Sequence, residues 1–446
     1  MTTTPKPEAH IAPKPEVRSS ADVIRKHKEY IWPSVSNYYQ QPLVADRGSM
    51  QYIWDLDGRK YLDFFGGILT VSVGHANPKV TGPIKAQVDK LQHTSTLYPN
   101  EQIVALAEKL AQITPGHLQK SYFTNSGTEA NEMAILLARM STGSFDVVAL
   151  RHSYSGGSTL TRSMTGQAPW RKAGVVSVGF SHAVNPYCYR CPLHLKYPDC
   201  GVACANDVEN LIQTGTSGQI AAFIAEPIQG VGGFITPPPE YFKMVFKIVK
   251  KYGGLFISDE VQTGFGRTGK KWFGIEQWEV TPDIITTAKG MGNGVPIGAT
   301  ITTAELANAF QGLTISTFGG NPVTSVAARA TIQVIEEEQL LENSHTMGKH
   351  FREQLEMLKE KHQIIGDVRG MGLMQALELV EDRETKQPSP AGTNALMEEA
   401  RKRGLLIGKG GFYGNVIRMS PPLNISKADV DEAVRILDES FAAVKK

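Results

Sequence analysis

Short runs of apolar, largely β-branched residues alternate with amphipathic stretches through the middle of the chain. The runs are DVVAL (146–150), AAFIA (221–225), GGLFISD (253–259) and DIITT (283–287). Runs of this length without polar alternation are typical of strands buried on both faces. Between two of them, PEYFKMVFKIVKKYG (239–253) has apolar residues at helical spacing, a proline near its start and a glycine at its end, which predicts a helix. This alternation predicts an α/β fold with a mostly parallel sheet covered by helices.

The two ends of the chain have a different pattern. Residues 54–75 alternate around an Asp-Gly turn, which predicts a hairpin that leads into a glycine-rich loop. After STFGGNPVTS (316–325) the pattern is helical to about residue 361, and strands then mix with helices up to a last helix capped by Ser426 and Asp429. We therefore expect a second, smaller α+β domain. The predicted divisions are a disordered leader (1–20), an N-terminal segment that contributes to the small domain and the substrate pocket (21–75), the large domain (76–330) and the C-terminal small domain (331–446).

Composition narrows the classes of partner. Lysine and arginine number 46 and aspartate and glutamate 44, so the net charge is only +2, which gives no footprint for nucleic acid or an anionic membrane. Mean hydropathy is −0.21, and no apolar run is long enough to span a bilayer. The first residues repeat Pro-Lys-Pro-Glu and lack an apolar targeting core. These features predict a small-molecule partner, no nucleic acid or membrane binding, and a cytoplasmic location.

Three ionisable residues follow directly on buried runs, at the edge of the sheet where ligands bind in such folds. Glu226 follows the run 221–225, Asp259 ends the next run, and Lys289 stands just after the last one, before three closely spaced glycines. A desolvated lysine has a lowered pKa and is the nucleophile expected to form a Schiff base. The alternative is a lysine that extends to solvent. For Asp259 the alternative is a structural ion pair.

A fourth feature is the start of a helix in NSGTEAN (125–131). Ser126, Gly127 and Thr128 open it, and Ser126 and Glu129 are spaced as a capping box. Free backbone N–H groups and hydroxyls at a helix start bind phosphate, although an ordinary cap has the same sequence. A phosphate site, a buried carboxylate and a strand-end lysine together match the needs of pyridoxal phosphate. A nicotinamide dehydrogenase is disfavoured because GMGNGVPIG lacks G-x-G-x-x-G spacing. A binding module without catalysis is disfavoured because both Lys289 and Asp259 are present.

The motifs NSGTEAN, AEPIQG, SDEVQTGFGRTG, TTAKGMGNG and STFGGNP stand in the order found in a known family. From about Tyr52 to its C-terminus the chain resembles the class III, fold-type I pyridoxal-phosphate aminotransferases, and most of all their alanine–glyoxylate (β-aminoisobutyrate–pyruvate) type. The resemblance implies a large domain with a seven-stranded sheet. It also implies ping-pong transfer of an amino group from an amino acid or ω-amine to pyruvate or glyoxylate. An ω-amino acid or diamine transaminase, a taurine–pyruvate transaminase and an aminomutase stay open as alternatives.

The resemblance also implies roles for individual residues. Lys289 would form the aldimine with the cofactor and Asp259 would hold its pyridinium nitrogen. The other implied cofactor contacts are the phosphate ligands Ser126, Gly127 and Thr128, the phenolic-oxygen partner Gln262, the ring-stacking Tyr154, and Thr317 from a second subunit. The last contact implies a homodimer with shared sites, with a tetramer as the alternative. Ser155 stands where relatives usually have histidine.

Two further residues would select the substrate. Arg418, in NVIRMSPP, would bind the α-carboxylate of the substrate as a bidentate pair. When a substrate has no α-carboxylate, Glu226 would pair with Arg418 instead, so that the buried guanidinium keeps a partner. An ion pair that never opens is the alternative.

All four cysteines of the chain lie close together in sequence. Cys188, Cys191, Cys200 and Cys204 have the spacing C-x2-C-x8-C-x3-C, which is compatible with a structural zinc site in a surface loop. His182 and His194 are substitute ligands. Free thiols are the alternative, and a cytosolic setting argues against disulfides.

Overall fold

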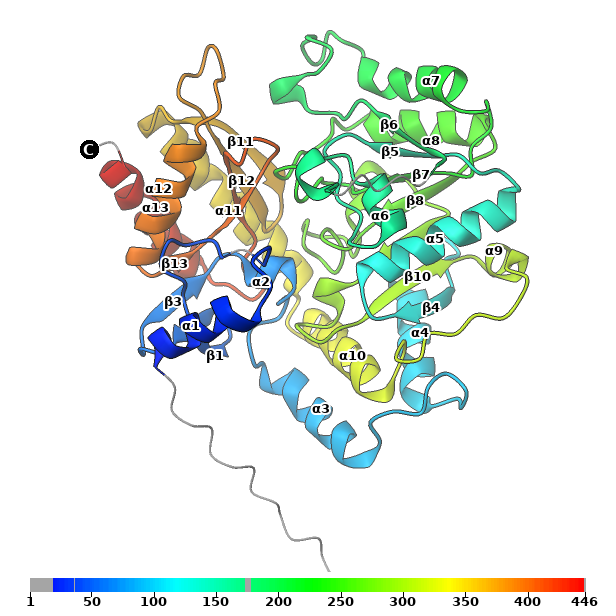
Figure 1. Cartoon of the computed structure of the whole chain (residues 1–446), viewed down its shortest axis with the longest axis horizontal. Helices are drawn as coiled ribbons and strands as arrows, with labels where there is room; N and C mark the ends of the chain where they lie inside the picture. Colours follow the sequence, from blue (N-terminus) through cyan, green and yellow to red (C-terminus); the bar gives the residue numbers. More distant parts are fainter. Residues whose placement is uncertain (1–18, 36, 173–177, 445–446) are drawn as a thin grey trace, which may run out of the picture.

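The computed structural model describes residues 19–35, 37–172 and 178–444. Its large domain, on the right of Figure 1, is built on a seven-stranded sheet. In spatial order the strands are β4 (Lys120–Thr124), β10 (Gly298–Thr302), β9 (Ile284–Thr287), β8 (Leu255–Asp259), β7 (Ala222–Ala225), β5 (Val147–Leu150) and β6 (Phe180–Ala183). Only β10 runs antiparallel to its neighbours. The predicted mostly parallel sheet is confirmed, and the four predicted runs are β5, β7, β8 and β9.

Successive residues of the central strands pack against opposite layers of helices. Phe223 of β7 and Phe256 of β8 share a core with α8 (Tyr241–Lys251). The next residues, Ile224 and Ile257, share a different core with α5 (Gly127–Thr142). This two-residue period explains why these strands are apolar throughout. The helices of this domain and its lower edge are α3 (Pro78–Lys90), α4 (Glu101–Ile113), α5 (Gly127–Thr142), α6 (Thr159–Met164), α7 (Ala203–Gly215), α8 (Tyr241–Lys251), α9 (Ala304–Ala309) and α10 (Pro322–Glu337).

The small domain joins the two ends of the chain. Its antiparallel sheet has the order β11 (Ile365–Met371), β12 (Met374–Leu379), β15 (Val416–Met419) and β14 (Gly408–Gly410), and it packs with α11 (Leu340–Lys361), α12 (Pro390–Lys402) and α13 (Lys427–Val444). A second sheet pairs the N-terminal strands β1 (Ala45–Ser49), β2 (Tyr52–Asp55) and β3 (Lys60–Asp63) with β13 (Leu405–Leu406). In Figure 1 the blue N-terminal strands accordingly lie against the orange C-terminal region.

The N-terminal predictions have mixed outcomes. The hairpin over residues 54–75 is confirmed, because β2 and β3 pair antiparallel. The glycine-rich loop contains α2 (Gly66–Leu69), a short turn with left-handed backbone. The predicted leader reaches residue 20, but Ser19 already caps α1 (Ser20–Tyr30). Its residues 1–18 lie outside the described part, and the exact domain limits stay a prediction.

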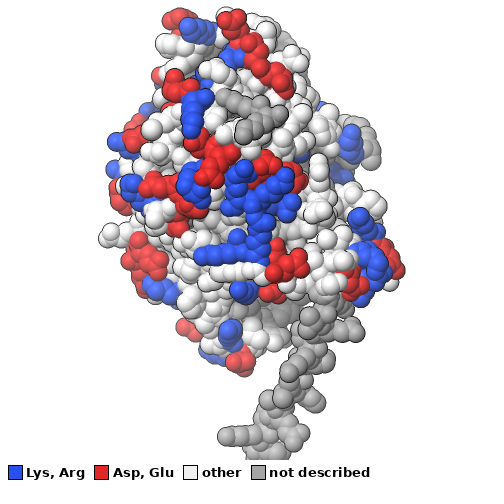
Figure 2. Space-filling model, turned by 90° about the vertical axis from the view of Figure 1, so that its left-hand side faces the viewer, with Lys and Arg blue, Asp and Glu red and all other residues white. Residues whose placement is uncertain are grey.

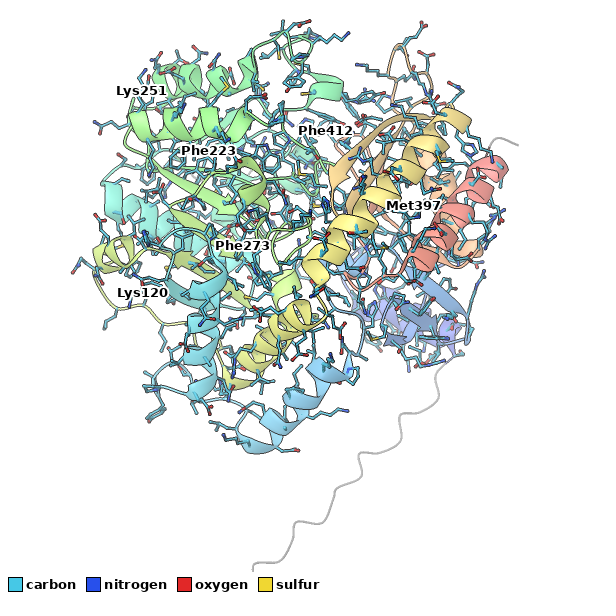
Figure 3. All side chains as sticks on the ribbon, turned by 180° about the vertical axis from the view of Figure 1, so that it is seen from behind. Lys120, Phe223, Lys251, Phe273, Met397 and Phe412 are labelled. Carbon is cyan, nitrogen blue, oxygen red and sulfur yellow. The ribbon has the colours of Figure 1, made fainter. Side chains whose placement is uncertain are left out.

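The surface and interior show how charge and apolar groups are distributed. Figure 2 shows Lys and Arg interspersed with Asp and Glu on the face of the small domain. Ion pairs such as Lys361–Asp438 and Arg435–Glu432 lie there. Figure 3 places Phe223 and Phe273 within the large domain, Met397 within the small one and Phe412 at the boundary between them. Among the described residues, no helix combines the length and apolarity needed to cross a bilayer.

Candidate active site

A cavity of about 380 Å³ lies beyond the carboxyl ends of β7, β8 and β9. The structure brings together at this cavity all the predicted cofactor residues except Thr317, and Glu226 as well. The residues concerned are Ser126, Gly127, Thr128, Tyr154, Glu226, Asp259, Gln262 and Lys289. They come from separate parts of the chain, so the strand order of the sheet is what unites them.

Lys289 follows β9 with a backbone φ of 41°, a left-handed conformation that non-glycine residues rarely adopt. Burial lowers the pKa of its amine to about 8, although Asp259 and Glu226 act in the opposite direction. Its side chain makes no hydrogen bond or ion pair with a residue in the described ranges. The next residue is glycine because a Cβ there would stand 2.6 Å from Ser72 Oγ. The fold therefore holds in the cavity a lysine amine that loses its proton at a much lower pH than an ordinary lysine.

Asp259, the last residue of β8, is 5% exposed. Its Oδ2 accepts a hydrogen bond from Asn131 Nδ2 at 2.8 Å, and its Oδ1 accepts one from the Val261 N–H at 3.2 Å. Burial raises the pKa of this carboxyl, while both N–H donors and nearby Lys289 favour the charged form. The carboxylate is therefore fixed in one orientation at the cavity.

The N-terminus of α5 forms another wall of the cavity. Ser126 is the N-cap, and its Oγ accepts the Glu129 N–H at 3.3 Å, as predicted. The Glu129 carboxylate accepts the N–H of Asn125 rather than that of Ser126, so the predicted box is shifted by one residue. Gly127 permits a close approach, since a Cβ there would lie 2.8 Å from Val261 Cγ2. The first N–H groups of this helix have no intrahelical acceptor and are suited to an anion.

Two polar or aromatic side chains complete the cavity. Tyr154 packs edge-on against Trp170 with ring centroids 5.2 Å apart, and burial raises the pKa of its phenol. Gln262 has a buried Oε1 that finds no hydrogen-bond partner in the part of the chain that the structure describes. An unpartnered buried amide oxygen is costly and indicates that a further polar group belongs beside it.

Glu226 and Arg418 lie close together but do not form the predicted ion pair. The Glu226 carboxylate accepts the N–H groups of Tyr154 at 3.0 Å and Gly230 at 2.8 Å. Arg418 donates to the carbonyl oxygens of Gly230 at 3.2 Å and Lys409 at 2.8 Å. Gly230 therefore bridges the two groups through its own N–H and C=O. In this structure the guanidinium donates to backbone carbonyls, and its pairing with Glu226 stays a prediction.

Thr317 is not in this cavity. It is exposed and lines a separate hollow of about 660 Å³ beside Tyr122 and Glu129. The two hollows share Asn125 as a lining residue. The segment before α10 that carries Thr317 also exposes the apolar side chains Leu313, Ile315 and Phe318.

The cysteine loop gives no support for zinc. The four cysteines line one small cavity of about 20 Å³ and are free thiols. Among the residues that the structure describes, no group of three or more His, Cys, Asp or Glu is arranged to hold a metal ion. The substitute ligand His182 instead hydrogen-bonds the Met164 carbonyl at 2.9 Å. The loop matches the alternative of free thiols.

Comparison with known proteins decides the family. The family model described as aminotransferase class III matches residues 34–441. The Arabidopsis thaliana protein named alanine–glyoxylate aminotransferase 2 homolog 2, mitochondrial, is 48% identical over 96% of this chain and 89% of its own length. The Pseudomonas aeruginosa 5-aminovalerate aminotransferase DavT is 37% identical over 90% of this chain and 93% of its own length. The chain belongs to the class III aminotransferases.

Solved structures agree with this class III aminotransferase in fold, and one of them was solved with PLP bound. An amine transaminase from an uncultivated Pseudomonas species, solved in its PLP-bound form, superposes with a TM-score of 0.87 and 33% identity. It covers 93% of this chain and 98% of its own. The predicted fold type, enzyme class and cofactor are thereby confirmed: the enzyme is a PLP-dependent transaminase that uses a 2-oxo acid. The cytoplasmic location stays a prediction.

The residues present fit this cofactor. The cavity offers a helix N-terminus for a phosphate, the carboxylate Asp259, the lysine Lys289 and the unpartnered amide oxygen of Gln262. The sequence analysis identified all of these groups, but not the residues that hydrogen-bond to them. It missed Asn131, although this residue closes the NSGTEAN motif, and it missed Gly230 as the bridge between Glu226 and Arg418.

Proposed function

We propose that this enzyme transfers an amino group from alanine or an ω-amino acid to pyruvate or glyoxylate. The observation that carries the proposal is the meeting, in one cavity, of Lys289 with its lowered pKa, buried Asp259 and the open start of α5, with buried Arg418 just behind Glu226. The names of the Arabidopsis and Pseudomonas relatives support the two classes of donor.

Each residue has a proposed task. Ser126, Gly127 and Thr128 would hold the phosphate through the start of α5, Tyr154 would pack on the ring, and Gln262 would meet the phenolic oxygen. When bound, pyridoxal phosphate supplies an aldehyde that condenses with amines and a ring that withdraws electrons. Asp259 keeps a proton on the ring nitrogen by its charge. The Lys289 amine first anchors the cofactor and, once freed by substrate, takes a proton from the substrate carbon and returns it.

Arg418 is proposed to bind the α-carboxylate of the substrate. Its guanidinium lies over the ring of Phe65 at 5.1 Å and is 4% exposed, so it is strongly desolvated. A carboxylate binds such a group better than neutral carbonyls do, because the bond is charge-assisted on both sides. Pyruvate, glyoxylate or alanine would therefore draw Arg418 away from the Gly230 and Lys409 carbonyls. A donor without an α-carboxylate would leave it on those carbonyls.

We also propose a homodimer with shared sites. The exposed apolar side chains around Thr317 are a surface that a second copy would bury. Asn125 connects the Thr317 hollow with the Lys289 cavity, so a partner docked at this face would lie next to the phosphate end of the site. Light scattering of the purified enzyme is expected to give twice the mass of one chain. A monomer with full activity would contradict the homodimer proposal.

The experiment that tests the substrate proposal is Arg418→Ala assayed by single half-reactions. We expect a severe loss with pyruvate, glyoxylate and alanine, and a much smaller loss with β-alanine or 5-aminovalerate. Arg435→Ala, which removes an exposed arginine of α13 that pairs with Glu432, is the matched control and should leave both classes unchanged. Equal losses for both classes with Arg418→Ala would show that this arginine supports the fold instead of binding substrate.

A further inference from the structure

Asn131 lies in the second turn of α5, three residues after the proposed phosphate ligand Thr128, and is 1% exposed. Its Nδ2 donates to Asp259 Oδ2 at 2.8 Å and to the Ser155 carbonyl oxygen at 2.9 Å. Its Oδ1 accepts the Thr286 hydroxyl at 2.6 Å. A backbone carbonyl can only accept, so the amide nitrogen must face Ser155 and the orientation of the amide is fixed.

These bonds join three parts of the site through one side chain. Asp259 ends β8, Thr286 belongs to β9, and Ser155 follows the ring-stacking candidate Tyr154. Because Asn131 stands on the helix whose start faces the cavity, a shift of this amide would move the carboxylate relative to that helix start. Both N–H groups of the amide donate hydrogen bonds, so the side chain cannot turn without losing one of them.

The bond to Asp259 has a second effect besides alignment. An N–H donor stabilises the ionised form of a carboxylate, and a buried carboxylate needs such donors to stay charged. Within the described ranges, Asp259 accepts one other hydrogen bond, from the Val261 N–H at 3.2 Å. Of the two hydrogen bonds that hold this carboxylate, the one from Asn131 is therefore the shorter.

We propose that Asn131 is the positioning residue that keeps Asp259 ionised and aligned with the phosphate end of the cavity. The inference rests on the proposed cofactor role of Asp259. It predicts that removing the amide changes how the bound cofactor titrates and how tightly it is held, with little change in the fold.

The test compares two Asn131 variants with a matched buried amide elsewhere. Asn131→Asp keeps the shape but sets a second carboxylate against Asp259, and two carboxylates in contact must share a proton. Asn131→Ala removes the donor altogether. Asn185→Ala is the control, because Asn185 is also buried and bonds the side chain of Gln229 at 3.0 Å without lining the Lys289 cavity.

For each protein the PLP dissociation constant, the pH titration of the cofactor absorbance and the thermal midpoint are measured. Both Asn131 variants are expected to shift the titration midpoint by about one unit and to weaken PLP binding about tenfold or more. They should still be labelled at Lys289 by borohydride. Asn185→Ala should match the wild type in titration and dissociation constant.

Each other outcome has a defined meaning. Wild-type titration and binding in both Asn131 variants would overturn the inference while leaving the proposed function intact. Insoluble Asn131 variants beside a soluble Asn185→Ala would also overturn it, since Asn131 would then be a residue needed for folding. Absence of the Lys289 label in the wild type would instead overturn the proposed function itself.

Discussion

Two buried clusters of charged groups lie on either side of the loop after β7 (226–235), and they are built in opposite ways. In the first, Lys289, Asp259 and Glu226 surround a cavity, and Lys289 has no ion-pair partner among the described residues. In the second, Arg369 Nη1 lies 2.7 Å from Glu378 and 2.7 Å from Asp367. Arg190 and Tyr187 also bind Glu378, so this carboxylate is in direct contact with all of its partners.

The pKa values of the two clusters diverge accordingly. In the first, burial pushes the groups toward their neutral forms: it lowers the pKa of Lys289 and raises that of Glu226. In the second, burial also acts to raise the pKa of Glu378, but Arg369, Tyr187 and Arg190 hold it below its ordinary value. Direct ion pairing fixes charges and joins the two domains, whereas charged groups around a cavity are available for chemistry.

The largest expected effect on stability is at the paired cluster. Glu378→Ala leaves Arg369 and Arg190 without their shared carboxylate in the interior, which should cost about 3–5 kcal/mol of folding free energy. We expect a clear drop in the thermal unfolding midpoint. Glu432→Ala, which breaks only the surface pair with Arg435, is the control and should show no measurable change. A midpoint equal to the wild type in Glu378→Ala would mean that the cluster does not hold the domains together.

For Asp259→Asn we expect the reverse: a large loss of activity and little change in stability. Loss of its charge removes the partner of the ring nitrogen and should raise the barrier by about 3 kcal/mol, roughly 150-fold in rate. The thermal midpoint should stay near that of the wild type, because a buried charge is removed without leaving an ion pair broken. Activity within a few-fold of the wild type, or a fall in the thermal midpoint like that of Glu378→Ala, would show that Asp259 has a structural role instead of a catalytic one.

A smaller effect is expected in the pH dependence of cofactor uptake, which reports on the unpaired Lys289. Only the neutral amine of Lys289 attacks an aldehyde, so the rate of PLP uptake by the apoenzyme should rise with pH and level off above about 8, the lowered pKa of this lysine. Below that midpoint the rate should fall about tenfold per pH unit. Glu226→Gln should move the midpoint down, since the Glu226 charge acts to raise the pKa of Lys289. A midpoint near the ordinary lysine value of 10.5 would mean that the site does not desolvate its lysine.

The sequence predicted the features that local pattern determines. The runs that became β5, β7, β8 and β9 are apolar throughout, so their ends and the residues there, Asp259 and Lys289, were identified before the structure. The short strand β10 was missed because GATIT has few bulky apolar residues. Contacts across long separations were also missed: Arg418 and Gly230 lie 188 residues apart, and Tyr187 and Glu378 lie 191 apart. No local pattern encodes such pairs, and cysteine spacing alone does not encode the geometry of a metal site.

The account depends most directly on the covalent anchor. Purified enzyme reduced with borohydride and digested should carry the cofactor label on the peptide that contains Lys289, and Lys289→Ala should carry none. Lys250, a surface lysine paired with Asp283, is the internal control and should remain unlabelled. Label on Lys289 alone is the predicted result; label on any other lysine, or none in the wild type, would contradict the assignment of the unpaired cluster as the catalytic site.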